Sequence, residues 1–263
     1  MIRRVLNVYI IELARAVRVR STFLGPTLMI IIILLTPFAY PIQKDTDSDY
    51  DFLAYVLPLS INVFGHFMSL IYAASLISTE LSNGSIRMAL TRPLRRREYY
   101  AAKALHAITY TLALNLIALA AAWILVHTLG NLSGIQFGDE IIYTDEAMRN
   151  TLLATLALSF LPQCASVFFA LMLSTMTRNT TAAIGMAVGG WIFIETIKYP
   201  LDIAPYLYST YAEAPWTVYN DRCNAFDVSF FPDAYWAIGI PLIYIAAFAS
   251  ISLFILGRRN LVA

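Results

Sequence analysis

Four polar side chains lie inside apolar stretches that are long enough to cross a bilayer. Asn62 and His66 are one helical turn apart in the second stretch, Asn115 is midway along the third and Gln163 interrupts the fourth. Polar groups in such places are costly and mark either a functional path or hydrogen bonds between helices. Two interpretations stay open: Asn62, His66, Asn115 and Gln163 line a path between two copies of the chain, or they join neighbouring helices.

Motifs for covalent chemistry are missing from the sequence. It has no G-x-x-x-x-G-K-[ST] phosphate loop, no H-E-x-x-H zinc pair and no G-x-S-x-G nucleophile elbow. Cys164 and Cys223 lack metal-ligand spacing, and a disulfide between them is not expected. We therefore expect no catalytic site, no metal and no cofactor in this chain. The alternative is an intramembrane enzyme that uses His66 with Asn62 or Gln163.

The stretch from Glu80 to Lys103 is strongly basic and separates two long apolar runs. It is too short for a domain but long enough for one helix and a turn. Gly84 allows a sharp turn, and Ser85 is a good helix-capping residue. Pro93 would end a short helix that starts at Ser85. We expect Glu80 to pair with one of Arg95, Arg96 and Arg97.

Composition places the chain in a membrane. It is 59% hydrophobic and only 13% charged, whereas soluble domains carry roughly 25% charged residues. A bilayer core of about 30 Å needs roughly 20 apolar residues in a helix, and none of the apolar blocks alternates as a barrel strand would. We predict a single all-α transmembrane domain over 1–263, with spans at about 23–42, 54–78, 104–129, 151–175, 182–199 and 234–256.

Orientation follows from the basic residues, which collect on the cytoplasmic side of membrane proteins. Most of the 18 lysines and arginines fall on one predicted side, and only Lys44, Arg149, Lys198 and Arg222 fall on the other. We therefore expect both termini and the 80–103 loop to be cytoplasmic. Residues 1–20 read as an amphipathic helix lying in the interface. The outer segment 200–233 is rich in aromatic residues, so we expect short helices or a re-entrant hairpin lying on the outer leaflet.

The basic loop carries a recognisable pattern, E-x-x-x-G-[ST]-x-x-x-x-L-x-x-P-x-x-R-x-x-[FY]-x-x-x-[KR]. This pattern and the six-span layout resemble permease subunits of the ABC type-2 exporter family, over nearly the full length. The resemblance implies a permease-like bundle in which a short coupling helix docks on a separate ATPase. The matching positions are Glu80, Gly84, Ser85, Leu90, Pro93, Arg96, Tyr99 and Lys103, with Arg87 as a further contact.

The resemblance also implies partners and a mechanism. An ABC nucleotide-binding subunit would hold ATP and Mg²⁺, because this chain has no ATPase motif. A second permease copy, identical here, would complete a dimer in the cytoplasmic membrane, and no nucleic acid is involved. The smooth face made by Gly185, Gly189 and Gly190 suits such helix contacts. The path residues would then serve translocation, with export as the expected direction.

The alternative is a membrane scaffold that transports nothing. Charge reversal at Arg87 and Arg96 is expected to uncouple transport from ATP hydrolysis.

Overall fold

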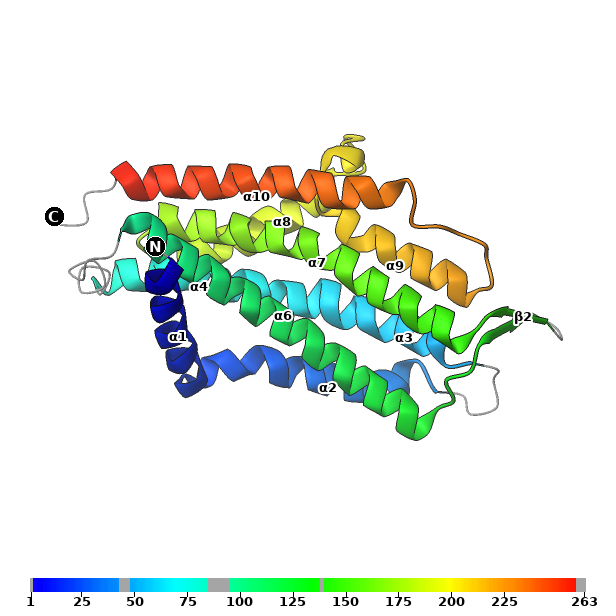
Figure 1. Cartoon of the computed structure of the whole chain (residues 1–263). Helices are drawn as coiled ribbons and strands as arrows, with labels where there is room; N and C mark the ends of the chain where they lie inside the picture. The colour runs from blue at the N-terminus through cyan, green and yellow to red at the C-terminus, as the bar shows by residue number, and fades with distance from the viewer. Residues whose placement is uncertain (1, 43–47, 85–94, 138–139, 259–263) are drawn as a thin grey trace.

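The computed structural model describes residues 2–42, 48–84, 95–137 and 140–258. Within that part of the chain, six helices are long and apolar enough to cross a membrane, which confirms the predicted number. They lie side by side as one elongated bundle (Figure 1). Helices satisfy their own backbone hydrogen bonds, as a lipid environment requires. The six segments are Arg20–Ala39, Tyr50–Ser82, Arg96–Leu129, Asp145–Met176, Thr180–Ile197 and Asp233–Arg258.

The described elements follow one another along the chain without a large sheet. Some of the six membrane segments are built from more than one element. In chain order the elements are α1 (Ile2–Arg18), η1 (Arg20–Phe23), α2 (Leu24–Ala39), α3 (Tyr50–Pro58), η2 (Leu59–Gly65), α4 (His66–Ser82), α6 (Arg96–Leu129), β1 (Ile135–Phe137), β2 (Glu140–Tyr143), α7 (Asp145–Met176), α8 (Thr180–Ile197), η3 (Ala204–Tyr206), α9 (Thr210–Cys223) and α10 (Asp233–Arg258).

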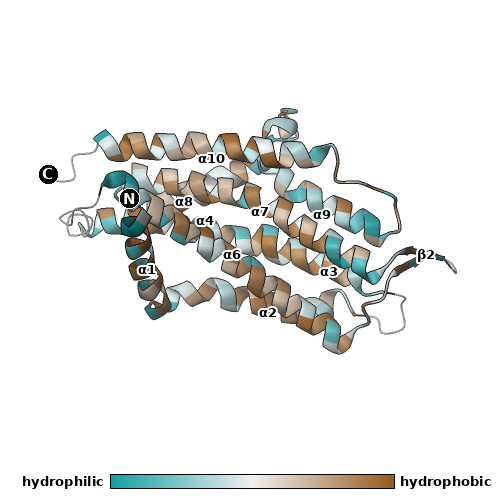
Figure 2. Cartoon of the chain, viewed as in Figure 1, coloured by the Kyte–Doolittle hydropathy of each residue, from teal (hydrophilic) through white to brown (hydrophobic). Residues whose placement is uncertain are grey.

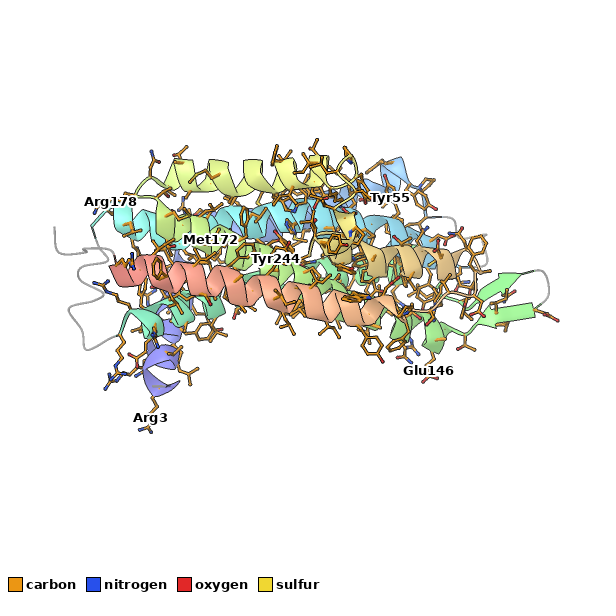
Figure 3. The ribbon with its side chains drawn as sticks, turned by 90° about the horizontal axis from the view of Figure 1, so that it is seen from above. Arg3, Tyr55, Glu146, Met172, Arg178 and Tyr244 are labelled. Carbon is orange, nitrogen blue, oxygen red and sulfur yellow. The ribbon has the colours of Figure 1, made fainter. Side chains whose placement is uncertain are left out.

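The two ends of the bundle differ in charge. The start of α1 and the end of α10 lie at the same end (Figure 1). Arg3 and Arg178 also lie there, whereas Glu146 lies at the opposite end (Figure 3). Hydrophobic residues fill the middle of the bundle, and hydrophilic residues gather toward both ends (Figure 2). Six spans return the chain to the end of the bundle where it began, which agrees with the position of the start of α1 and the end of α10.

Helix α1 crosses the bundle nearly at right angles (Figure 1). Its apolar side chains Leu6, Ile10, Leu13 and Val17 are exposed on the surface. The helix also contacts α6, where the Tyr9 hydroxyl lies 3.1 Å from the Thr109 hydroxyl. An exposed apolar face on a helix that runs across the bundle is typical of a helix lying in the membrane interface.

Helices α6 and α7 are longer than the predicted spans, with 34 and 32 residues. At 1.5 Å per residue each reaches about 50 Å, well beyond a hydrocarbon core of about 30 Å. The added turns are polar, since α6 begins at Arg96 and α7 at Asp145. The predicted 80–103 loop is therefore too long at both ends. Its first residues belong to α4 and its last eight to α6.

Helix α7 is central and packs against α4, α6, α8, α9 and α10. Two buried clusters hold the bundle together along its length. One surrounds Tyr50, Leu53 and Trp216, and the other surrounds Leu70, Val167 and Leu171. By contrast, the outward sides of α2, α8 and α10 expose large apolar residues, including Phe38, Phe193 and Ile243. Such surfaces suit contact with lipid or with another membrane helix.

The second span contains a π-helical segment, η2, between α3 and α4. Pro58 ends α3 and has no backbone N–H, so a regular α-helical hydrogen bond is lost at that point. The Ser60 hydroxyl also donates to the Val56 carbonyl at 2.7 Å. π-helical turns are frequent at functional sites, and this one carries Asn62.

The segments at the opposite end differ from the sequence prediction. A small antiparallel hairpin, β1–β2, interrupts the otherwise helical chain between α6 and α7. The 200–233 segment contains the helix α9, but α9 runs alongside α7 and α3 instead of lying flat on a leaflet (Figure 1). Trp216 and Tyr219 are buried in these contacts. Their aromatic area is used for packing within the chain, which the aromatic composition alone did not reveal.

Candidate functional site

A group of charged and polar side chains joins α1, α4 and α6 where the basic connection begins and ends. We call Glu12, Arg15, Glu80, Tyr99 and Lys103 the anchor cluster. Glu80 lies in the last turn of α4, and Tyr99 and Lys103 lie in the first two turns of α6. Residues four apart share one face of a helix, so Tyr99 and Lys103 both reach Glu80.

Glu80 is the centre of the anchor cluster. The Lys103 Nζ donates to Glu80 Oε1 at 2.6 Å, and the Tyr99 hydroxyl donates to Glu80 Oε2 at 2.6 Å. Lys103 Nζ also lies 2.8 Å from Glu12 Oε2 on α1. The Arg15 guanidinium approaches Glu80 more loosely, at 3.6 Å. Both oxygens of the Glu80 carboxylate are thus bound, and three helices are tied together.

Burial makes these contacts energetically consequential. Glu80 and Lys103 are only 6% and 1% exposed. Charges removed from water are stable only when they are paired and hydrogen-bonded. The cluster contains two carboxylates and two cations, so its formal charge is balanced. The prediction that Glu80 pairs with one of Arg95, Arg96 and Arg97 is wrong: the cations beside Glu80 are Lys103 and Arg15.

Arg96 contacts the end of α10 within the bundle. Its Nη1 donates to the Gly257 carbonyl at 2.7 Å and also to the Leu256 carbonyl, both at the end of α10. The last carbonyls of a helix have no partner within the helix, so Arg96 caps α10 and fixes it to α6. The neighbouring Glu98 carboxylate accepts from the Arg95 N–H at 2.9 Å, which caps the start of α6.

The remaining residues of the loop pattern are only partly described. Gly84 directly follows the end of α4 and has a φ of 68°, the left-handed conformation that glycine adopts without strain. The residues that would show the predicted sharp turn lie beyond Gly84 and outside the described part of the chain. Ser85, Arg87, Leu90 and Pro93 lie outside the described residues, and so does the predicted short helix that they would form.

Three of the four predicted path residues form a hydrogen-bonded chain between helices. The Asn115 Nδ2 on α6 donates to the Gln163 Oε1 on α7 at 2.8 Å. The Gln163 Nε2 lies 3.5 Å from the Asn62 Oδ1 in η2. Asn62 in turn donates to the Ala212 carbonyl of α9 at 3.2 Å. The amides of Asn62, Asn115 and Gln163 therefore join η2, α6, α7 and α9.

His66 does not belong to this chain of amides. Its ring packs against Trp191 of α8, with 4.8 Å between the ring centroids. The buried Nε2 of His66 has no hydrogen-bond partner among the described residues. The structure thus pairs the His66 ring with an aromatic side chain and the three amides with each other.

Sequence reasoning missed Glu12 and Arg15 as members of the site. The signal was present, since Glu12 is the one acidic residue in a basic stretch from Arg3 to Arg20. A carboxylate on a basic helix needs a cationic partner when its side of the helix packs against the bundle. Its partner, Lys103, is separated from it by 91 positions in the sequence, so spacing alone could not identify the pair.

A second buried ion cluster lies where α8 ends. The Lys198 Nζ is 2.5 Å from Glu195 Oε2 and 3.2 Å from Glu213 Oε2 on α9. Glu195 lies one helical turn before Lys198, and Glu213 is an additional partner from another helix. Burial by itself lowers the pKa of Lys198, but the hydrogen bonds and charges of Glu195 and Glu213 outweigh it and raise that pKa above its usual value.

The raised pKa of Lys198 predicts a loss of stability at high pH. A cation with a raised pKa in the folded state contributes its full stabilisation below its unfolded pKa of about 10.5 and loses it as pH rises through the folded value. We expect the difference in unfolding free energy between the unmodified chain and Lys198→Met to be constant from pH 7 to 9 and to shrink above pH 10.5. Detergent-solubilised protein, unfolded by denaturant across this range, provides the measurement. A difference that grows above pH 10.5 would contradict the assignment.

Among the described residues, no group of His, Cys, Asp and Glu side chains is arranged to hold a metal ion. The chemistry of the site is therefore described by its ion pairs and hydrogen bonds. These fix the positions of helices relative to one another.

Comparison with known proteins identifies a family. Residues 26–199 match the family described as "Protein of unknown function (DUF2705)". No curated protein matches the chain. The matched region extends from α2 to just beyond the end of α8, and it contains Glu80, Tyr99, Lys103 and the three linked amides. Because the match covers well over half of the 263 residues, the chain belongs to the DUF2705 family.

Proposed function

We propose that the chain is the membrane-spanning permease subunit of an ATP-driven ABC transporter of the type-2 exporter kind. In this role it lies in the cytoplasmic membrane with both termini in the cytoplasm. A separate nucleotide-binding subunit carries ATP and Mg²⁺ and grips the basic connection between α4 and α6. The permease itself performs no covalent chemistry. It transmits the motion of that subunit to its own membrane-spanning helices, whose arrangement then changes.

The observation that carries the proposal is the anchor cluster. A force applied to the connection between α4 and α6 reaches the bundle through its two flanking helices. Glu80 on α4 binds Tyr99 and Lys103 on α6, so the flanks move as a unit. The ion pair of Lys103 with Glu12 joins the interfacial helix α1 to these two helices. The hydrogen bond from Arg96 to the end of α10 joins α10 to them as well. This connectivity supports a role in transmitting motion.

The pathway for substrate is part of the proposal. Asn62, Asn115 and Gln163 hydrogen-bond one another inside a single copy, which supports their role as links between helices. They would reach a substrate only if those links opened during the cycle. His66 lies apart, toward α8. Gly185 and Gly189 of α8 have open space where a side chain would begin, which suits close contact with a second, identical copy.

The proposal predicts that exposed arginines of the connection bind the ATPase. Arg96 caps α10, so its reversal would damage the bundle as well as any coupling. We therefore choose Arg97, which is exposed on α6, together with Arg87. The expected result for Arg87→Glu with Arg97→Glu is normal membrane insertion, loss of co-purification with the ATPase encoded by a neighbouring gene, and loss of ATP-dependent transport in vesicles.

A matched control separates coupling from general charge effects. Arg149→Glu reverses an exposed arginine at the opposite end of the bundle and is expected to leave ATPase binding intact. A complex that retained full ATPase binding and transport with both reversals would refute the coupling role. Failure of the unmodified chain to recover any ATPase would refute the permease assignment itself.

A further inference from the structure

A pocket of about 380 Å³ opens between α1, η1, α2, α4 and α6. Its volume falls within the range of sites that hold small molecules, roughly 300–1,000 Å³. The anchor cluster forms one wall of this pocket through four of its members. The proposed coupling function uses these residues to hold helices together and makes no use of the space beside them.

The charged wall presents groups of both signs. Lys103 is enclosed, with its Nζ held between Glu80 and Glu12 at 2.6 and 2.8 Å. The Arg15 side chain is 62% exposed, and its contact with Glu80 is long at 3.6 Å. A guanidinium has five N–H donors, so Arg15 retains donors for an anion. The Glu12 carboxylate is partly exposed at the same wall and is able to accept from a cation.

Beyond the charged wall the pocket lining is largely apolar or aromatic, and the hydroxyls of Ser21, Thr22, Ser75 and Thr79 and the His106 ring add polar groups to it. Leu24, Met68, Ile71 and Leu76 line it, together with the stacked rings of Tyr72 and Tyr110. Val19, which lines the pocket, is exposed on the surface, and so are Val17 on α1 and Phe23 on η1 outside the pocket. An occupant therefore has a charged part at the Arg15 wall and an apolar part that continues into an apolar surface. That combination describes an amphiphile at the membrane interface.

We propose that this pocket binds the headgroup of a phospholipid with a primary amine, such as phosphatidylethanolamine. Its phosphate pairs with Arg15, its ammonium donates to Glu12, and its first acyl methylenes lie along Leu24 and Met68. The argument is charge complementarity. Glu12 and Glu80 balance Arg15 and Lys103, so a zwitterion leaves the wall neutral while an anionic headgroup does not. A choline headgroup has no N–H and donates no hydrogen bond to Glu12.

The test uses the full chain in mild detergent. The protein is equilibrated with mixed micelles that contain equal amounts of phosphatidylethanolamine, phosphatidylcholine and phosphatidylglycerol with identical acyl chains. It is then repurified, and the retained lipids are quantified by mass spectrometry. We expect the ethanolamine lipid to exceed the choline lipid by roughly ten-fold or more, about the effect of one hydrogen bond to a charged group.

Variants locate the binding. Arg15→Gln removes the anion-binding group, and Ser21→Trp fills the pocket from an exposed position on η1. Both are expected to return the retained lipids to the bulk ratio. Arg18→Gln removes an exposed arginine from the same helix outside the pocket and is expected to keep the preference. Equal retention of all three lipids, enrichment of the glycerol lipid, or a preference that survives Ser21→Trp would overturn the proposal. None of these outcomes depends on an ATPase partner.

Discussion

Replacing Lys103 by methionine is expected to be the most destabilising single change in the anchor cluster. Lys103 is 1% exposed and neutralises both Glu80 and Glu12. Its removal leaves two carboxylates packed against α6, where the Tyr99 hydroxyl still donates to Glu80 but Arg15 supplies only a loose ion pair. Removing one partner of a buried ion pair costs about 3–5 kcal/mol, because the remaining charge is left without compensation. We expect Lys103→Met to lower the unfolding free energy by about this amount.

Denaturant titration of the purified chain in detergent provides the measurement. Arg97→Met is the matched control, since Arg97 is exposed on the same helix and a surface substitution changes stability by about 0.5 kcal/mol or less. The double variant Glu80→Gln with Lys103→Met removes a charge of each sign. It should be more stable than Lys103→Met alone, which is the coupling that a double-mutant cycle detects. If the two losses simply added, Glu80 and Lys103 would not be interacting in the protein.

The spans could be predicted from the sequence because a bilayer imposes their length. Runs of apolar residues long enough for the hydrocarbon core are a local signal, so all six segments were found, although α6 and α7 begin several residues earlier than predicted. The same signal stops at the hydrocarbon boundary. It therefore missed the polar first turns of α6 at Arg96 and of α7 at Asp145, where helix continues because Glu98 and Thr144 cap it.

Contacts between distant positions were not predictable in the same way. Glu80 was assigned to arginines of the same predicted loop, but packing of α4 against α6 brings Lys103 to it, and α1 supplies Arg15. Arg96 was free to reach α10 only because that helix ends beside it. Polar residues inside the spans were correctly singled out as unusual. Their partners, by contrast, depend on which helices are neighbours, and no periodicity in one helix encodes that.

Arg222 is expected to be the most important side chain for the opposite end of the bundle. It lies at the end of α9 and donates to the Val228 carbonyl from Nε at 3.0 Å and from Nη2 at 2.9 Å. Its Nη1 donates to the Thr151 hydroxyl of α7 at 2.8 Å. The guanidinium also lies 5.5 Å from the centre of the Tyr143 ring, beside the β1–β2 hairpin. One side chain thus joins α9, α7, the hairpin and the segment that leads to α10.

We expect Arg222→Met to lower the unfolding free energy by about 2–4 kcal/mol, since hydrogen bonds to a charged group contribute about 1.5–3 kcal/mol each and are not fully additive. The segment 224–232 should also become susceptible to added protease, because Val228 loses its contact. Arg222→Lys keeps the charge but not the planar guanidinium. Its unfolding free energy should therefore lie between that of the unmodified chain and that of Arg222→Met. Arg149→Met is the control, as Arg149 forms only an exposed pair with Asp145 that is worth about 0.2–0.5 kcal/mol. Equal protease resistance of Arg222→Met and Arg149→Met would show that packing of Trp216 and Tyr219 alone holds α9 in place.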